Sequence, residues 1–265
     1  MTGSRVDVSA VAALIRTAAR DELLPRFRLT GRQEKADGSW ITEADLAMQT
    51  RIRLALAAAH PEIAFLGEEM DAAEQQHLLA TTNTGLWLLD PLDGTNNYAA
   101  GIPLFGVSLA LLRDGNIDLG VVYDPVHDEC FTAGRGQGAS LNNSPLRAPT
   151  AGIALAKTTA CIDFKRLSPP LAARIAATPP YASQRSIGSV ALDWCWVAAG
   201  RFHIYLHGRQ NLWDYAAGQL ILEEAGGYSD TLDGSPAPYT LSPRSAVCAA
   251  DPKLFAEWVA YLRTG

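Results

Sequence analysis

The spacing of apolar residues changes along this chain, and that change constrains the fold more than any other sequence feature. Residues 7–24 and 44–59 carry apolar side chains every three to four positions, which is typical of amphipathic helices. After Pro61 the apolar runs become short and rich in β-branched and aromatic residues, which favours strands, and Asp114-Gly115 is typical of a hairpin turn. We therefore expect helices packed on an antiparallel sheet. Its predicted strands are 63–66, 87–89, 107–112, 117–123 and 129–132.

From about Pro149 onward, strands and helices alternate, and this pattern predicts an α/β arrangement. A strand at Thr158–Ile162 begins the pattern, and its last helix should end at the left-handed stop Gly226-Gly227. The predicted helices are 171–177, 190–199 and 215–225. With 265 residues the chain is long enough for two halves. We expect an N-terminal α+β half over 1–148 and a C-terminal α/β half over 149–265.

The start of the second predicted helix has a local signal of its own. Thr42 and Asp45 have the spacing of a capping box, in which each residue bonds to the backbone of the other. The polar segment 30–39 before it predicts an exposed loop.

Composition argues against several classes of protein. Hydrophobic residues make up 48% of the chain and charged residues 19%, as in ordinary globular proteins, and no apolar run approaches the roughly 20 residues that cross a bilayer. The net charge of −6 gives no electrostatic reason to expect a nucleic acid or an anionic membrane as partner. Charged residues interrupt the N-terminal apolar stretch and the four cysteines lack CxxC spacing, so we expect reduced thiols and a cytoplasmic location.

Acidic residues gather in three short segments at the ends of predicted elements. Gly67-Glu68-Glu69 and the segment 90–95 each follow a predicted strand, and Trp213-Asp214 opens a predicted helix. Carboxylates held by short, rigid connections are ligands that suit Mg²⁺. Taken singly, the paired glutamates are typical of a solvated loop, Asp-Gly of a turn and Asp214 of a helix N-cap. The three segments together favour a magnesium site.

The segment Asp-Pro-Leu-Asp-Gly-Thr at 90–95 is the most informative of the three. Pro91 fixes one backbone dihedral and restricts Asp90 before it, so both aspartates can point to one place. Gly94 lets the backbone approach a ligand closely, and a helix that starts at Thr95 would offer N–H groups to an anion. A cation and a phosphate could therefore meet at this segment.

The same motifs resemble those of the inositol monophosphatase family, within the lithium-sensitive, magnesium-dependent phosphatases. The resemblance rests on GEE at 67–69, DPLDGTNNY at 90–98 and WDYAAG at 213–218, supported by ITEAD at 41–45 and EEAGG at 223–227. It implies a layered α-β-α-β-α sandwich, assembled as a homodimer, with the active site between the two halves. It also implies inhibition by lithium.

The resemblance further implies a role for each residue of the motifs. Two or three Mg²⁺ ions would be held by five groups, namely Glu68, Asp90, the backbone carbonyl of Leu92, Asp93 and Asp214. The residues that orient or activate the attacking water would be Thr95, Asp45 and Glu69. The residues that contact the substrate would be Gly94, Thr95, Arg185, His207 and Asp214.

The chemistry expected of such a site agrees with a phosphatase. Hydrolysis of a phosphate monoester needs a nucleophile derived from water, neutralised phosphoryl oxygens and a stabilised leaving alkoxide, and a metal cluster can provide all three. The sequence has no GxSxG elbow, no P-loop and no GxGxxG after a strand. We therefore expect a Mg²⁺-dependent phosphomonoesterase whose partner is a small phosphate ester, with inositol 1-phosphate favoured.

The substrate is the open question, because one position departs from the family pattern. Inositol phosphatases have a glutamate seven residues before the aspartate of the tryptophan motif, and here that residue is His207. A histidine can bond hydroxyl groups, and with Arg209 nearby in sequence it could instead favour a second phosphate. Lys165-Arg166, after the strand that ends near Asp163, is a second candidate for contacting the substrate. The alternatives are an adenosine 3′,5′-bisphosphate phosphatase, a fructose-1,6-bisphosphatase or a histidinol-phosphate phosphatase. A regulatory binding protein with secondary phosphatase activity is the alternative of another class.

Overall fold

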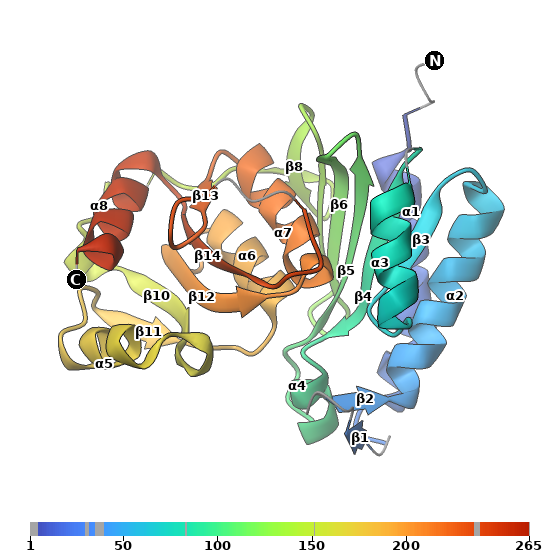
Figure 1. The fold of residues 1–265 in the computed structure, drawn as a ribbon, viewed down its shortest axis with the longest axis horizontal. Coiled ribbons are helices and arrows are strands. Elements are labelled where there is room, and N and C mark those ends of the chain that lie inside the picture. Colours follow the sequence, from blue (N-terminus) through green and yellow to red (C-terminus); the bar gives the residue numbers. More distant parts are fainter. Residues whose placement is uncertain are drawn as a thin grey trace.

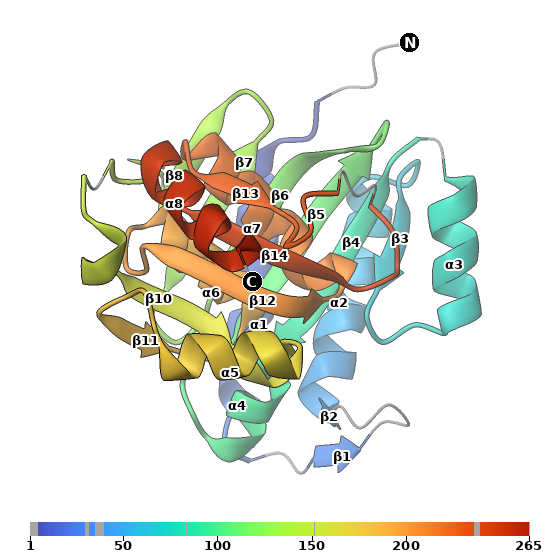
Figure 2. The same ribbon diagram turned by 60° about the vertical axis from the view of Figure 1, so that its left-hand side comes forward.

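Two β-sheets with a pair of helices between them organise the chain (Figures 1 and 2). The computed structural model describes residues 5–29, 32–34, 40–82, 84–150, 152–235 and 239–264. Within this part, the larger sheet has seven strands, in the spatial order β3 (Ala64–Gly67), β4 (Leu86–Asp93), β5 (Gly106–Arg113), β6 (Asn116–Asp124), β7 (Glu129–Gly134), β8 (Gly138–Leu141) and β9 (Ser144–Leu146). The smaller sheet has five, in the order β11 (Ser183–Arg185), β10 (Thr159–Asp163), β12 (Ile204–Gln210), β14 (Arg244–Ala249) and β13 (Tyr228–Asp230).

Helices cover both faces of each sheet and complete five layers. α1 (Val8–Glu22) and α2 (Glu43–Ala59) pack on the outer face of the larger sheet, and α8 (Pro252–Arg263) and α5 (Pro169–Ala177) lie beyond the smaller one (Figure 1). The central layer consists of α6 (Val190–Ala198) and α7 (Leu212–Glu224). Further elements are α3 (Ala72–Thr81), α4 (Thr95–Ala100) and the antiparallel pair of β1 (Arg32–Glu34) and β2 (Trp40–Thr42). The expected α-β-α-β-α sandwich is confirmed.

The larger sheet shows why five layers form. All eight residues of β4 are buried, and successive side chains of a strand point to opposite faces. Leu86 and Leu88 therefore pack with the central helices, whereas Trp87 and Leu89 pack with α1 and α2. A strand that is apolar on both faces needs a helix layer on each side.

The smaller sheet follows the same alternation. Ile162 and Leu206 face α5 and α8, whereas Cys161 and Tyr205 face the central layer. β10 and β12 run parallel, with Cys161 opposite Tyr205 and Asp163 opposite His207. The alternation therefore directs Asp163 and His207 toward the central helices as well.

Several local predictions are confirmed. The capping box of Thr42 and Asp45 is present at the start of α2, and Gly226 has the left-handed φ of +92° that ends α7. Residues 148 and 149 do not interrupt the packing, because one apolar cluster includes β4, β12 and β14 together with both central helices. The division into two halves at that point stays a prediction.

Other predictions need correction. The first helix ends at Glu22, not residue 24, and β3 runs parallel to β4, because the helix α3 connects them as a crossover. In the segment 30–39, residues 32–34 form β1, so the predicted loop is wrong there, and residues 30, 31 and 35–39 lie outside the described residues. The helices α3 and α8 were not predicted from the sequence. No helix in the described part is long and apolar enough to cross a membrane.

Candidate active site

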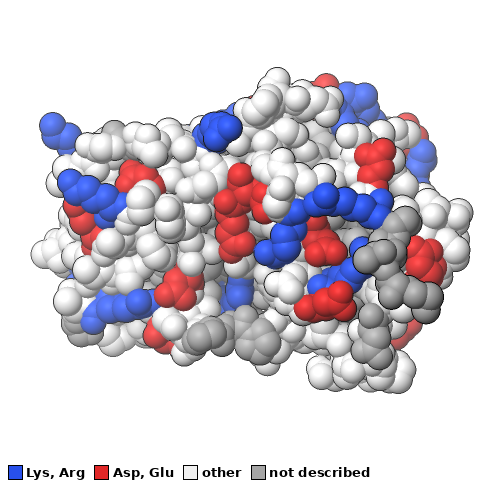
Figure 3. All heavy atoms as spheres, turned by 90° about the horizontal axis from the view of Figure 1, so that it is seen from above, with Lys and Arg blue, Asp and Glu red and all other residues white. Residues whose placement is uncertain are grey.

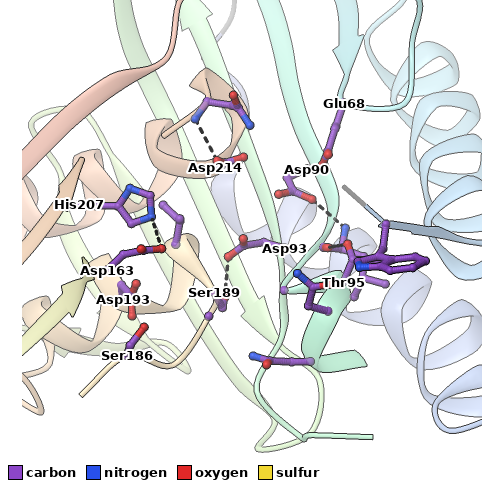
Figure 4. Close-up of a pocket in the computed structure, with 18 of the residues that line it drawn as sticks. Glu68, Asp90, Asp93, Thr95, Asp163, Ser186, Ser189, Asp193, His207 and Asp214 are labelled. Carbon is purple, nitrogen blue, oxygen red and sulfur yellow. Dashed lines mark hydrogen bonds and ion pairs between the residues drawn. The ribbon is translucent and has the colours of Figure 1, made fainter. Parts of the chain in front are cut away.

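One pocket of about 230 Å³ collects most of the residues that the motifs predicted (Figure 4). It is lined by the end of β4, the first turns of α4, α6 and α7, and residues of β10 and β12. Eight of the predicted site residues line it, namely Glu68, Asp90, Leu92, Asp93, Gly94, Thr95, His207 and Asp214. The chain thus brings together segments that lie more than a hundred positions apart in the sequence.

A bulge at the end of β4 aims two of the carboxylates into this pocket. We expected the Asp-Pro-Leu-Asp segment to follow the strand, but β4 continues to Asp93. Asp90 pairs with Ser108 and Asp93 with Gly106, so β4 uses three steps where β5 uses two. In a regular strand, residues three positions apart face opposite sides of the sheet. The extra residue of the bulge puts Asp90 and Asp93 on the same side. Pro91 suits the irregular position because it has no N–H to donate to the ladder.

The glycine after this bulge turns the chain into α4. Gly94 has a φ of +93°, which side-chain-bearing residues rarely adopt, and an added Cβ would lie 3.0 Å from the carbonyl oxygen of Leu104. The close backbone approach predicted here is therefore an approach to other protein backbone. It places Thr95 at the start of α4 and beside the aspartates.

Asp214 reaches the pocket from the first turn of α7. It is the third residue of the helix and not its N-cap, and its Oδ2 accepts a 3.0 Å bond from the backbone N–H of Asn211. The hydroxyl of Ser108 donates to the carbonyl of Trp213 at 2.8 Å, which ties this turn to the strand beside Asp90. The helix start thus fixes the carboxylate, and the bond from Ser108 fixes the turn that carries it.

The carboxylate of Asp93 is bound by the start of α6. Its Oδ2 accepts a 2.5 Å bond from the hydroxyl of Ser189 and a 2.7 Å bond from the N–H of Ala191. Asp90 Oδ1 accepts from the N–H of Leu92 at 2.9 Å. These bonds set the orientation of each carboxylate in the pocket.

The electrostatics of the four carboxylates favour a bound cation. Burial, reinforced by the negative charges of Glu68 and Asp93, holds the pKa of Asp90 and of Asp214 well above the usual range. Burial also raises the pKa of Asp93 to about 6, although the bonds from Ser189 and Ala191 oppose the rise. Buried like charges of this kind are normally neutralised by a proton or a metal ion.

The donor set fits Mg²⁺. The predicted ligands offer only oxygen, which magnesium and calcium prefer over nitrogen or sulfur. Among the described residues, no three His, Cys, Asp or Glu side chains already form a coordination group. The four carboxylates therefore line one pocket without converging on a single point.

Thr95 and Asp45 make the contact that the motifs implied. The hydroxyl oxygen of Thr95 lies 2.9 Å from the carbonyl oxygen of Leu92 and 3.3 Å from Asp45 Oδ1. Asp45 is buried, and its Oδ2 accepts from both the N–H and the hydroxyl of Thr42 in the capping box. The helix cap therefore fixes one oxygen of Asp45 and presents the other to Thr95.

Two predicted site residues lie away from the pocket. Arg185 is exposed on the edge strand β11, where it donates to the hydroxyl of Ser183 and the carbonyl of Gln184. Glu69 is half-buried outside the lining, and its N–H donates to the side chain of Gln49 at 3.0 Å. Neither residue lines the pocket, and their assignment to substrate and water stays a prediction.

The pocket also contains residues that the sequence motifs did not mark or left open. Asp163, Ser189 and Asp193 line it, and so does Arg166, whereas its neighbour Lys165 does not. Asp163 followed a predicted strand, as the acidic motifs did, and this was the one signal available for it. Its proximity to His207 depends on the pairing of β10 with β12, which no short motif encodes.

Comparison with known proteins decides the family. Residues 4–264 match the family model described as the inositol monophosphatase family. The chain belongs to the inositol monophosphatase family. The relatives that define this family hydrolyse phosphate monoesters, so the protein is a phosphoric monoester hydrolase.

Curated relatives and solved structures agree with this membership. An inositol-1-monophosphatase of Mesorhizobium japonicum is 38% identical over 206 residues, which cover 76% of this chain and 75% of the relative. A Nus factor SuhB of Pasteurella multocida is 38% identical over 200 residues, covering 73% and 72%. The structure of a Thermotoga maritima IMPase superposes with a TM-score of 0.80 at 27% identity and covers 96% of this chain and 98% of that one.

Proposed function

We propose that the protein hydrolyses the phosphate of a small polyol phosphate, with inositol 1-phosphate as the favoured substrate, in a reaction that depends on two or three Mg²⁺ ions. The observation that carries this proposal is the bulge in β4, which directs Asp90 and Asp93 into the pocket that Glu68 and Asp214 also line. A protein that used these carboxylates only for stability would not need to bury their mutual repulsion.

The residues that would hold Mg²⁺ are Glu68, Asp90, the carbonyl of Leu92, Asp93 and Asp214. The carbonyl of Leu92 accepts from Thr95 with one lone pair and keeps a second for a cation. When bound, Mg²⁺ supplies Lewis-acid stabilisation of the phosphoryl oxygens and a more acidic water.

The other steps belong to the chain itself. The hydroxyl oxygen of Thr95 is placed to take a proton from a water molecule while its own proton, which bonds to the Leu92 carbonyl in this structure, passes to Asp45 Oδ1 at 3.3 Å, so that the water becomes the hydroxide nucleophile and Asp45 holds the proton. The first N–H groups of α4, after Gly94, would face the phosphate. Burial of the pocket floor excludes bulk water from the carboxylates and strengthens each of these contacts.

The charge pattern supports a small-molecule substrate. On the face shown in Figure 3, Lys and Arg side chains lie beside Asp and Glu or singly, without a broad basic surface for a nucleic acid or a membrane. We propose a cytoplasmic homodimer, on the family resemblance and on the four buried, free cysteines. Sedimentation equilibrium measures the assembly state directly.

A second candidate function follows from the names of the relatives. Several of them are called Nus factor SuhB, at the same identity as those called inositol-1-monophosphatase. A binding role beside the enzymatic one is therefore a specific hypothesis for this chain. Retention of a macromolecular partner by the Asp93→Asn variant, together with negligible turnover of the native protein, would favour it.

The deciding experiment is a substrate panel. We expect inositol 1-phosphate to give the largest kcat/KM among inositol 1-phosphate, adenosine 3′,5′-bisphosphate, fructose 1,6-bisphosphate and histidinol phosphate. Turnover should disappear with a chelator and return with Mg²⁺. Preference for another member of the panel would reassign the substrate, and hydrolysis that survives chelation would contradict the metal-dependent mechanism.

A further inference from the structure

The side of the pocket formed by β10 and β12 carries its own polar cluster. Figure 4 shows Asp163 and His207 across the pocket from Glu68 and Asp90. Asp163 ends β10, His207 lies opposite it on β12, and Arg166 follows in the short helical turn Phe164–Arg166. We call Asp163, Arg166 and His207 the charge-paired wall, and Glu68, Asp90, Asp93 and Asp214 the acidic wall.

The hydrogen bonds of the charge-paired wall show which of its atoms carry protons. His207 Nδ1 accepts a 3.2 Å bond from the N–H of Arg209, so the proton of the neutral ring is on Nε2. That nitrogen lies 3.2 Å from Asp163 Oδ2 and donates to it. The guanidinium of Arg166 donates to the same carboxylate oxygen, and the N–H of Arg166 donates to Asp163 Oδ1 at 3.3 Å.

These contacts fix the charge of each member. Burial lowers the pKa of His207, against the pull of Asp163, so the ring is neutral at pH 7. Burial would raise the pKa of Asp163, but its bonds and proximity to His207 and Arg166 outweigh this and lower it, so the carboxyl is ionised. One negative charge and one positive charge then cancel, and the wall is neutral as a whole.

The wall still offers hydrogen-bond donors to a ligand. A guanidinium has five N–H donors, and the bond to Asp163 uses one of those of Arg166. The side chain of Arg166 is 47% exposed, whereas those of Asp163 and His207 are 17% and 3% exposed. Arg166 is therefore the accessible member; half-buried Asp163 bonds to it, and buried His207 bonds in turn to Asp163.

We propose that Asp163 sets the specificity of this side of the pocket: by pairing with Arg166, it makes the site reject leaving groups that carry a second phosphate. This inference rests on the proposed function and concerns its specificity. An arginine alone would attract a second phosphate, because the two can form paired, charge-assisted bonds. Asp163 pairs with Arg166, and its negative charge repels the negative charge of a second phosphate. The site therefore accepts a hydroxyl group at a position where it rejects a phosphate.

A matched pair of substrates tests the proposal. Inositol 1-phosphate and inositol 1,4-bisphosphate differ only by the second phosphate, and release of the 1-phosphate is measured from each. We expect the wild-type enzyme to favour the monophosphate, and Asp163→Asn to raise the ratio of kcat/KM for bisphosphate over monophosphate about tenfold, since it leaves Arg166 uncompensated. Arg166→Gln should lower that ratio, because it leaves the carboxylate uncompensated.

The double variant separates charge from structural damage. Asp163→Asn combined with Arg166→Gln restores a neutral wall, so its ratio should return to within about twofold of wild type, even where both rates fall. Asp114→Asn, which removes the same charge at the exposed turn between β5 and β6, should leave the ratio unchanged. A ratio that Asp163→Asn does not move, in an enzyme that hydrolyses inositol 1-phosphate, overturns the proposal and leaves the proposed function intact.

Failure of the proposed function has a different signature. It would show as no Mg²⁺-dependent release of phosphate from either compound by the wild-type enzyme. Calorimetric binding of the same two compounds in the presence of Mg²⁺ then still gives the ratio of affinities. An unchanged affinity ratio in Asp163→Asn would overturn the inference in that case as well.

Discussion

The two walls of the pocket use acidic residues in opposite ways. Asp163 is ionised and satisfied, because Arg166 and His207 both bond to it. Burial raises the pKa of Asp90 and of Asp214, and the negative charges of the neighbouring carboxylates reinforce the rise. The charges of the charge-paired wall compensate one another, whereas the acidic wall needs protons or a cation to compensate its charge. The comparison teaches that charge compensation, more than the count of acidic residues, separates a metal site from a recognition surface.

The largest expected effect is on the acidic wall itself. Asp93→Asn should lower kcat about 10²-fold or more, because the cluster loses a charged ligand while the bonds from Ser189 and Ala191 can still form. Steady-state kinetics at saturating Mg²⁺ measure it. Turnover near the wild-type value would show that the acidic wall is not the catalytic centre.

Lithium should distinguish the two walls. A small monovalent cation competes for carboxylate oxygens but brings half the charge, so about 10 mM LiCl should slow Mg²⁺-dependent turnover about tenfold. An equal concentration of NaCl controls for ionic strength. The Asp163→Asn variant should be as sensitive as wild type, and a loss of sensitivity there would mean that the walls do not act separately.

A smaller effect is expected at the residue that orients Asp93. Ser189→Ala removes the hydroxyl that bonds to Asp93 Oδ2, so Mg²⁺ should bind about fivefold more weakly. Calorimetric titration of the metal-free protein with Mg²⁺ gives this affinity without reference to turnover. Ser189→Thr keeps the hydroxyl and should restore binding, and equal weakening in both variants would assign the effect to packing.

The smallest effect is on stability in the absence of metal. Carboxyls with raised pKa bind protons more tightly when the chain is folded, so they favour the fold at low pH and lose that contribution as the pH rises through about 6 for Asp93. The Tm of the chelated protein should fall by about 2–4 °C between pH 5 and pH 7. Saturating Mg²⁺ should abolish this fall, and an equal fall with and without Mg²⁺ would contradict the assignment.

The sequence predicted the acidic wall better than the charge-paired wall, for a physical reason. Asp90 and Asp93 lie in one short segment, and Pro91 and Gly94 mark it by their residue types alone as an unusual backbone. Even there, the bulge was not predicted, because it depends on how β4 pairs with β5.

Asp163 and Arg166 carry no such local mark. An Asp followed three residues later by an Arg is common on exposed turns, and only the parallel register of β10 with β12 places them beside His207. The larger fold was predictable because the apolar periods of strands and helices are local features of the sequence. The helices α3 and α8 were nevertheless missed. Their burial is confined to a few side chains, such as Leu254 and Trp258 in α8.

The bonds from α6 to Asp93 have a consequence for engineering. Ser189 and Ala191 belong to the segment after residue 148, and the carboxylate that they orient belongs to the segment before it. A chimera that joins 1–148 of one relative to 149–265 of another could keep both sheets and every acidic motif, and still misplace this carboxylate by a small shift of one helix. Recombination between residues 148 and 149 would therefore yield proteins that fold normally but bind Mg²⁺ poorly.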